Sequence, residues 1–490
     1  MEDMDLVSRL EPEEIAVKRH ASTCVNPDDA KYEKDKRPLI QYLTPDAEWR
    51  MCAEIQRILL ETRMEFSQAE QWHVDEVVSA LDRIDPVNIS LIEDNITKHD
   101  QLAVIEEIGR YVSPETKALL HPGTTSYDIL DTARSYLQKK AWQDVIRPKA
   151  LEVISKISDK AEMALEEKHL QAGRTHLQDT SPVLFSQALS IYAARLAGRV
   201  RKTDECIGEL KGKISGIVGT GASIDAVIGE GKSLEFERAV LSKLGLEPDY
   251  TATQIVQKEE LADAGNAITT MMLVLKDFAN DMRLLYSSGI GEVTSRESEE
   301  RLGGSSADAT KNNPINYENI RGKAKAVEAG MAIIYDMIVT NLQRDLSGSV
   351  EARYEPAGMM AKAYESFSRA SKALDKLSIV EDRMAENLER VRKSPGEAMT
   401  AILRGEKWTH SEYGTGHDFV KNMGVRAKRE GKPLLEAALQ DREFRDVYDN
   451  MSSVKQMILG GELERYTGSA AERARLNINY ARETAGTKGN

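Results

Sequence analysis

Apolar residues recur at helical spacing over long stretches of the chain. The clearest stretch follows Glu260, where apolar residues stand at positions 261, 264, 268, 271, 275, 278, 282 and 285. Steps of three and four residues place all of them along one side of a single long helix. Because Leu, Ile, Met and Phe on such a stripe are usually core residues, we expect this helix to lie in a bundle.

Similar patterns predict four more long helical tracts, separated by short breaks rich in Gly, Ser and Thr. The tracts are Asp131–Leu170 with an interruption near Pro148, Ser181–Ile214, Asn316–Gln343 and Ser349–Lys393. No alternation of apolar and polar residues is long enough to predict a sheet, although a small hairpin is expected around 216–232. We therefore predict an all-α chain with an N-terminal helical domain (1–132), a central bundle of five long helices (133–383) and a C-terminal helical domain (384–490).

Composition supports helix and narrows the class of function. The 490 residues include only 14 prolines, and aromatic residues make up 6%. Asp and Glu number 80 against 66 Lys and Arg, so the net charge of −14 argues against nucleic acid or an anionic membrane as the partner. Three widely spaced cysteines without a CxxC pair favour a reducing compartment. With no signal-like or membrane-spanning segment, we expect a soluble, cytoplasmic protein.

The breaks between the helices contain the candidate chemistry. In GGSSADATKNNPINYEN (303–319), glycines give the backbone freedom, and Lys311 and a helix start favour an anion. In AGRTHLQ (172–178), His176 stands among hydrogen-bonding side chains. A solvated linker and a structural histidine are the alternative interpretations of these two segments.

Two earlier breaks offer further polar groups. HPGTTSYD (121–128) supplies hydroxyls and backbone donors suited to a carboxylate, and TKHD (97–100) supplies an imidazole and a carboxylate. An ordinary helix N-cap explains the first segment equally well, and a solvated helix start explains the second.

Taken together, these segments resemble the adenylosuccinate lyase family of the fumarase/aspartase superfamily. Residues 304–314 read GSSADATKNNP against the superfamily signature GSSxMPxKxNP, and HPGTTSYDILDTA is similar to HxGxTSxDxxDTA. TKHD, GRTHLQ, TATQIVQ (251–257), RDLSGSVEAR (344–353) and YTGSAAE (466–472) are similar to five further family motifs, in family order. The resemblance covers about residues 90–475.

The resemblance implies β-elimination of fumarate from adenylosuccinate, giving AMP, and from SAICAR, giving AICAR, in purine nucleotide biosynthesis. It makes Ser305 the general base and His176, paired with Glu318, the acid that protonates the leaving nitrogen, while Lys311 stabilises the aci-carboxylate intermediate. The substrate ligands that it implies are His99, Asp100, Thr125, Ser126, Thr175, Gln254, Asn313, Ser349 and Arg353.

The family also implies a homotetramer with a 20-helix core, in which three subunits contribute to each site, and no metal or other cofactor. Some positions depart from the family pattern: Asp308 and Ala309 replace Met–Pro, Asn312 stands where bacterial members commonly have Arg or Val, and residues 354–356 replace LPD. The first ~35 residues have no clear counterpart. A sibling lyase acting on another adduct, such as argininosuccinate or aspartate, stays an alternative, as does a non-catalytic scaffold.

Overall fold

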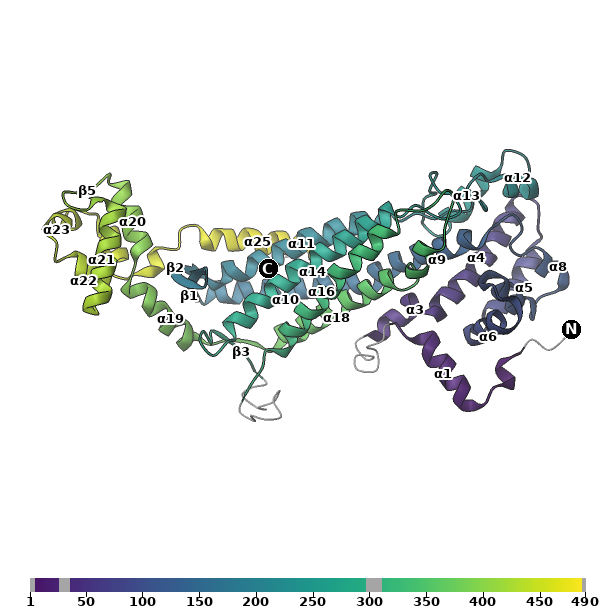
Figure 1. The fold of residues 1–490 in the computed structure, drawn as a ribbon, viewed down its shortest axis with the longest axis horizontal. Coiled ribbons are helices and arrows are strands. Elements are labelled where there is room, and N and C mark those ends of the chain that lie inside the picture. The colour runs from purple at the N-terminus through teal and green to yellow at the C-terminus, as the bar shows by residue number, and fades with distance from the viewer. Residues whose placement is uncertain (1–4, 26–35, 297–310, 487–490) are drawn as a thin grey trace. The chain divides into compact units, whose positions relative to one another are not determined.

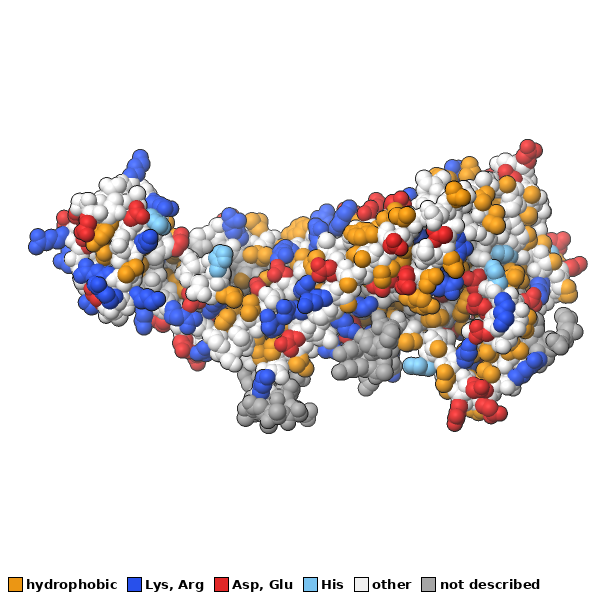
Figure 2. Space-filling model, viewed as in Figure 1, with side chains coloured by type: hydrophobic (Ala, Val, Ile, Leu, Met, Phe, Trp, Pro, Cys, Tyr) orange, Lys and Arg blue, Asp and Glu red, His pale blue; other side chains and the backbone are white. Residues whose placement is uncertain are grey.

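The computed structural model describes residues 5–25, 36–296 and 311–486. These ranges are mainly helical and contain three small antiparallel sheets of two strands each (Figure 1). The predicted all-α class is thereby confirmed. Among the described helices, none is long and apolar enough to cross a membrane. Acidic and basic side chains are interspersed over the face shown in Figure 2.

Five helices of 20 to 27 residues follow one another through the middle of the chain and form a bundle (Figure 1). They are α10 (Arg147–Glu166), α11 (Phe185–Gly208), α14 (Glu259–Leu285), α16 (Ile315–Asp336) and α18 (Glu355–Lys376). Side-chain contacts join neighbouring helices: Tyr192 with Asp281 at 2.5 Å, Phe278 with Tyr317 as packed rings, Lys323 with Glu365 at 3.0 Å, and Lys156 with Asp375 at 2.7 Å.

The apolar stripe of α14 is core, as its spacing predicts. Met271, Leu275 and Phe278 are fully buried, and Ile268 and Met282 are nearly so. Other sides of α14 are buried as well, at Ala267 and Met272 among others, which is typical of a helix surrounded by neighbours.

By its contacts, the chain divides into two compact units. Unit 1 comprises the described residues of 1–150, 199–273 and 322–369, and unit 2 those of 151–198, 274–321 and 370–490. Each of the five long helices contributes residues to both units. The predicted domain boundaries near 132 and 383 stay predictions.

Unit 1 also contains a further helix of 21 residues, α4 (Pro45–Glu65), several shorter helices and an apolar core of its own. Several of these helices begin with a proline, whose fixed φ suits the first helical turn, after a capping side chain; at α4, the Thr44 hydroxyl accepts from the N–H of Ala47 at 3.2 Å. The helices are α1 (Pro12–Thr23), α3 (Ile40–Leu43), α4 (Pro45–Glu65), α5 (Gln71–Leu81), α6 (Pro86–Ile92), α7 (Asp100–Gly109), α8 (Pro114–Ala118), α9 (Ser126–Ala141), α12 (Ala222–Ile228), α13 (Ser233–Ser242) and α17 (Ser347–Glu351), with shorter helical turns η1 (Val7–Arg9), η2 (Arg37–Leu39), η3 (Glu93–Thr97) and η4 (Trp142–Ile146).

Unit 2 contains the strands and the C-terminal helices. The strand pairs are β1 (Leu170–Thr175) with β2 (Gln178–Leu184), β3 (Val293–Ser295) with β4 (Leu377–Ile379), and β5 (Thr409–His410) with β6 (Gly414–Thr415). The helices are α19 (Glu381–Lys393), α20 (Gly396–Gly405), α21 (Gly416–Glu430), α22 (Leu434–Ala438), α23 (Arg442–Asp449), α24 (Ser453–Leu459) and α25 (Ala470–Ala485), with the turn η5 (Leu463–Arg465).

The prediction of a hairpin around 216–232 is wrong. This segment forms a loop and the short helix α12, and its glycines serve close backbone packing. Gly219 has a φ of 77°, and a Cβ atom there would collide with the carbonyl oxygen of Ala252. A hairpin is found instead at β1–β2, residues 170–184, at the break that contains His176.

Candidate functional site

A buried ion pair in unit 1 fixes the amino end of α9. Thr125 and Asp128 form a capping box, in which the Asp128 carboxylate accepts from the N–H of Thr125 at 2.7 Å. The same carboxylate accepts from the N–H of Gly216 at 3.2 Å and pairs with the Lys213 ammonium. Both side chains of the Asp128–Lys213 pair are fully buried. The Thr125 side chain is therefore committed in part to the helix cap, and the start of α9 is rigidly placed.

A second buried aspartate, one turn along α9, anchors the segment that contains Gln254. Asp131 accepts from the Lys258 ammonium at 2.9 Å.

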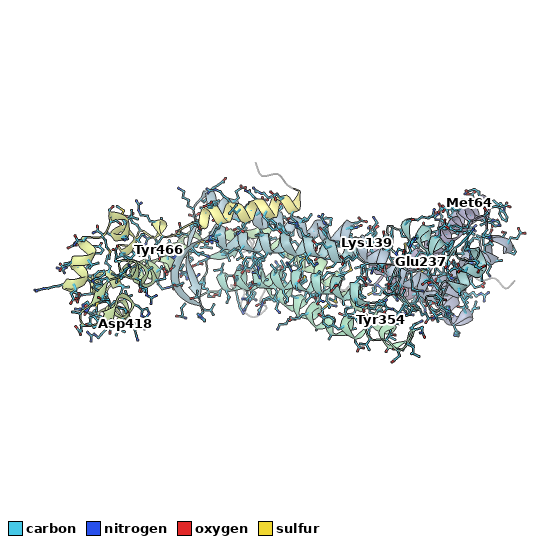
Figure 3. All side chains as sticks on the ribbon, turned by 90° about the horizontal axis from the view of Figure 1, so that it is seen from above. Met64, Lys139, Glu237, Tyr354, Asp418 and Tyr466 are labelled. Carbon is cyan, nitrogen blue, oxygen red and sulfur yellow. The ribbon has the colours of Figure 1, made fainter. Side chains whose placement is uncertain are left out.

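A buried glutamate lies near the first of these aspartates, Asp128, in the same unit. Glu237 of α13 (Figure 3) accepts from the N–H of Ile214 at 2.7 Å, and burial raises the pKa of Glu237. The sequence interpretation did not assign roles to Asp128 and Asp131, although both stand in the HPGTTSYDILDTA segment.

Four predicted substrate ligands form a cluster beside this helix end, which we name the α9 cluster: His99, Asp100, Ser126 and Arg353. His99 Nε2 lies 3.2 Å from Ser126 Oγ, and His99 Nδ1 lies 3.5 Å from Asp100 Oδ1. Arg353 Nη2 lies 3.6 Å from Asp100 Oδ2. The Arg353 side chain is 42% exposed and the Asp100 side chain 13%, so the guanidinium can turn from Asp100 to an anionic ligand.

Gln254 lies in the same unit, next to an arginine that sequence reasoning missed. Arg344 Nη1 donates to Gln254 Oε1 at 3.3 Å, and its guanidinium stacks 3.9 Å above the ring centroid of Tyr127. Arg344 is the first residue of RDLSGSVEAR (344–353), so this family motif was the sequence signal that could have identified it. Ser349 is 6% exposed and belongs to α17, four residues before Arg353.

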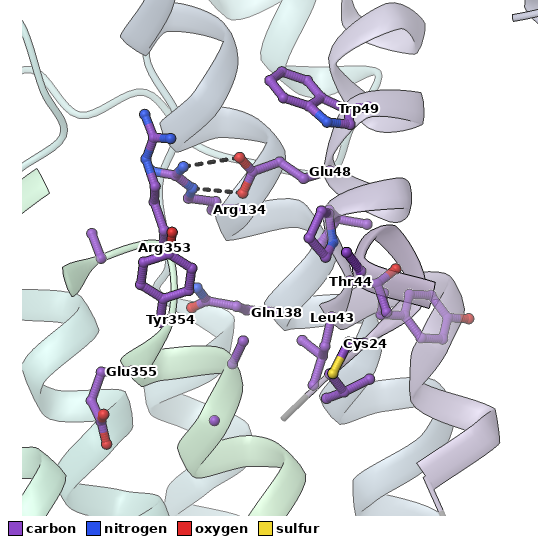
Figure 4. Close-up of a pocket in the computed structure, with 18 of the residues that line it drawn as sticks. Cys24, Leu43, Thr44, Glu48, Trp49, Arg134, Gln138, Arg353, Tyr354 and Glu355 are labelled. Carbon is purple, nitrogen blue, oxygen red and sulfur yellow. Dashed lines mark hydrogen bonds and ion pairs between the residues drawn. The ribbon is translucent and has the colours of Figure 1, made fainter. Parts of the chain in front are cut away.

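Arg353 also borders a cavity of about 670 Å³ within unit 1 (Figure 4). Trp49 of α4, Gln138 of α9 and Tyr354 line it. The cavity wall includes Arg134, whose guanidinium donates two bonds to the Glu48 carboxylate at 2.8 and 2.9 Å. Burial disfavours the charged form of Arg134, but the charge and hydrogen bonds of Glu48 together with the charge of Asp131 outweigh burial, so the pKa of Arg134 is raised. This arginine is thus already paired, and Arg353 is better placed to bind a ligand.

The remaining described candidates belong to unit 2. Thr175 and His176 are exposed at the tip of the β1–β2 hairpin. His176 and Leu177 form its two-residue turn, with φ values of 54° and 60°. This left-handed backbone is rare for residues other than glycine and costs about 1–3 kcal/mol per residue, so the surrounding contacts must hold it.

The other unit 2 candidates surround the start of α16. Lys311 and Glu318 are exposed, and Asn313 is half-buried just before Pro314, which precedes the first helical residue. Within the described parts of the chain, neither a hydrogen bond nor an ion pair joins His176 to Glu318, so their predicted pairing stays a prediction. Ser305, with Asp308 and Ala309, lies outside the described residues.

A family model described as lyase matches residues 47–328, more than half of the chain. The chain belongs to this lyase family. Among its relatives is the adenylosuccinate lyase of Methanocaldococcus jannaschii, 27% identical over 349 residues that cover 71% of this chain and 73% of that protein. The adenylosuccinate lyase of Bacillus subtilis is 30% identical over 297 residues, which cover 60% of this chain and 65% of that protein. The resemblance read from the motifs is thereby confirmed.

A solved structure of the same lyase fold is that of a fumarate lyase from Mesorhizobium sp. BNC1. It superposes with a TM-score of 0.75 at 21% sequence identity, over 91% of this chain and 97% of that protein. This likeness supports the helical fold.

Proposed function

We propose that this lyase is an adenylosuccinate lyase, which releases fumarate from adenylosuccinate to give AMP and from SAICAR to give AICAR. The observation that carries the proposal is the family relationship to adenylosuccinate lyases over most of the chain, together with the assembled α9 cluster. We place the reaction in purine nucleotide biosynthesis in the cytoplasm.

In the proposed reaction, Ser305 as an alkoxide removes the proton from the carbon next to a substrate carboxylate. Lys311 and Asn313 stabilise the resulting aci-carboxylate, which has two negative oxygens. The C–N bond then breaks, its electron pair stays on nitrogen, and His176 supplies the proton, with Glu318 favouring the imidazolium. The products are fumarate and the amine.

The α9 cluster and its neighbours serve substrate binding. Arg353 and Ser349 take the substrate phosphate, because a guanidinium forks onto phosphate oxygens. Gln254, Thr125, Ser126 and Thr175 are proposed hydrogen-bonding ligands, with His99 and Asp100 beside them.

The proposed assembly is a homotetramer with a 20-helix core, in which three subunits share each site. Its support is that, among the residues described, neither a hydrogen bond nor an ion pair joins His176 to Glu318 within one chain. Large apolar side chains are also exposed near the site residues of unit 1: Val339 is 75% exposed, Leu342 87% and Leu346 65%.

The test is fumarate release, followed by absorbance, with adenylosuccinate, argininosuccinate and aspartate as separate substrates. We expect turnover of adenylosuccinate alone, and Ser305→Ala should remove more than nine tenths of it. Ser242→Ala, an exposed serine on α13, is the matched control and should retain full activity. Turnover of argininosuccinate or aspartate in place of adenylosuccinate would contradict the proposal, and turnover of none would contradict it too.

A further inference from the structure

The hairpin that presents His176 has a backbone that its own residues do not favour. His176 and Leu177 are both left-handed, and Leu177 is 66% exposed, so burial of its side chain cannot hold the turn. The register also shifts between Ala172 and Arg174, at a bulge. Contacts from outside the turn must therefore hold its backbone, and with it the position from which the imidazole extends.

Arg174 makes these contacts from two residues away. Its Nε donates to Asp179 Oδ1 at 3.1 Å, across the strand pair next to the turn. Its two terminal nitrogens donate to the two carboxylate oxygens of Glu292 at 3.0 and 2.6 Å. A planar guanidinium held at three nitrogens has a fixed orientation, and it ties the end of β1 to Asp179 and Glu292.

Glu292 is a fully buried carboxylate, and it is tied to the elements around it. Its Oε1 accepts from Asn387 Nδ2 of α19 at 2.8 Å. Its backbone N–H donates to the carbonyl of Leu285, at the end of α14, at 3.0 Å, and its carbonyl accepts from Val380 at 3.0 Å. Glu292 is thus anchored to α14 and to α19 by contacts independent of the hairpin.

A second contact holds the hairpin to α19. Arg390 Nε donates to Asp179 Oδ2 at 2.6 Å, so Asp179 bridges Arg174 and α19. Ala172 of β1 packs against Leu388 and Val391. The base of the hairpin is therefore packed, and the charged contacts extend this support to the turn.

We propose that Glu292 and Arg174 are positioning residues, which hold His176 in the orientation that proton transfer requires. The proposal rests on the proposed role of His176 as the acid of the elimination. Neither residue needs to touch the substrate: the carboxylate fixes the guanidinium, the guanidinium fixes the strand end, and the strand end fixes the imidazole. Loss of the paired bonds from Arg174 to Glu292, the fork, should therefore lower the rate of the chemical step more than it weakens substrate binding.

The decisive variant is Glu292→Gln, which keeps the size and the bond from Asn387 but loses the charge and one acceptor for Arg174. We expect kcat to fall about 30-fold, with KM changed less than about threefold. Arg174→Lys, which keeps the charge without the fork, should give a smaller loss of about tenfold and serves if Glu292→Gln does not fold. Tyr192→Phe, which removes a half-buried bond to Asp281 in the same unit, is the control and should keep kcat.

A double variant separates positioning from general loss of structure. If Glu292 acts through His176, then His176→Gln with Glu292→Gln should be no slower than His176→Gln alone. The proposal would be overturned if the fold losses in kcat of the two single variants multiplied in the double variant. It would also be overturned if kcat were unchanged in both Glu292→Gln and Arg174→Lys.

Hydrogen exchange provides a readout that does not depend on the reaction. Amides of residues 170–184 should exchange faster in Glu292→Gln than in wild type or Tyr192→Phe, and unchanged exchange there would overturn the proposal. If the wild-type protein releases no fumarate, the proposed function fails, and this exchange comparison alone decides whether Glu292 holds the hairpin.

Discussion

The α9 cluster and the β1–β2 turn present their functional groups in opposite ways. In the α9 cluster, half-buried Asp100 and Ser126 already contact the more exposed His99 and Arg353 from distant segments, beside an aspartate that is fully buried. At the turn, His176 is exposed and has neither a hydrogen bond nor an ion pair to Glu318 within the described residues. The difference teaches that the proposed binding groups already meet within one chain, whereas His176 does not contact Glu318 among the described residues. We propose that His176 is held by Arg174 and Glu292 and meets its partners from other subunits.

The largest effect should come from the turn. We expect His176→Gln to lower kcat about 10³-fold with little change in KM, because a general acid acts in the transition state. Steady-state kinetics of fumarate release measure both. His417→Gln, an exposed histidine of unit 2, should behave as wild type. A His176→Gln enzyme that keeps a tenth of wild-type kcat would remove His176 from the chemistry.

The next effect concerns the rigidity of the α9 region. Asp128→Asn leaves the Lys213 ammonium buried without its counter-charge, so the free energy of unfolding should fall by about 3 kcal/mol. Denaturant unfolding measures this change. Asp94→Asn removes an exposed pair with Lys18 at 2.8 Å and should cost less than about 0.5 kcal/mol. Equal losses in the two variants would show that the buried pair does not hold the helix end.

Arg353 tests whether the α9 cluster binds substrate. Arg353→Ala should raise KM for adenylosuccinate about 30-fold and change kcat less than threefold, because a phosphate remote from the reacting carbon contributes mostly uniform binding. Arg83→Ala, an arginine of unit 1 that lies over the Tyr111 ring, is the control. An unchanged KM would indicate a substrate without phosphate at this position.

The smallest effect is a pH dependence of stability from His121, whose Nδ1 lies 3.1 Å from Gln56 Nε2. Burial lowers the pKa of His121 to about 4, against about 6.5 in the unfolded chain. Between these values the unfolded chain binds a proton that the folded chain does not, so stability falls as pH is lowered. We expect a loss of about 2 kcal/mol, less than the full shift because the ring keeps some solvent access.

The variant His121→Asn tests this assignment. Asparagine tolerates the left-handed φ of 69° at this position and keeps an acceptor for Gln56, but it does not titrate. Unfolding curves between pH 4 and pH 7 should be flatter for the variant than for wild type. Parallel curves would assign the acid sensitivity to other groups.

The long helices and the β1–β2 hairpin differ in how far the sequence predicts them. The stripe along α14 and the five long helices follow from apolar spacing, because the period of a helix is readable over many residues. The β1–β2 hairpin does not follow, since its bulge near Gly173 and the proline at position 182 interrupt the alternation that would predict strands. The tract predicted from Ser349 to Lys393 is likewise interrupted by β4.

Residue types alone could propose the site but not its supports. The motifs predict four ligands that the structure brings together: His99, Asp100, Ser126 and Arg353. Lys213 and Glu292 stand in segments without a site motif, and only the fold places them against Asp128 and Arg174. A buried partner of this kind depends on long-range packing, which has no local pattern in the sequence.

The central claim is that the proton donor and the rest of the site come from different copies of the chain. His176→Ala and Ser305→Ala, each inactive alone, should be mixed in equal amounts, unfolded together and refolded, with tetramers verified by sizing. If the two residues reach a site from different chains, about a quarter of the sites in random hybrids receive both wild-type residues, and activity should return to about a quarter of wild type. Hybrid tetramers without any activity would show that both residues come from one chain and would contradict the account.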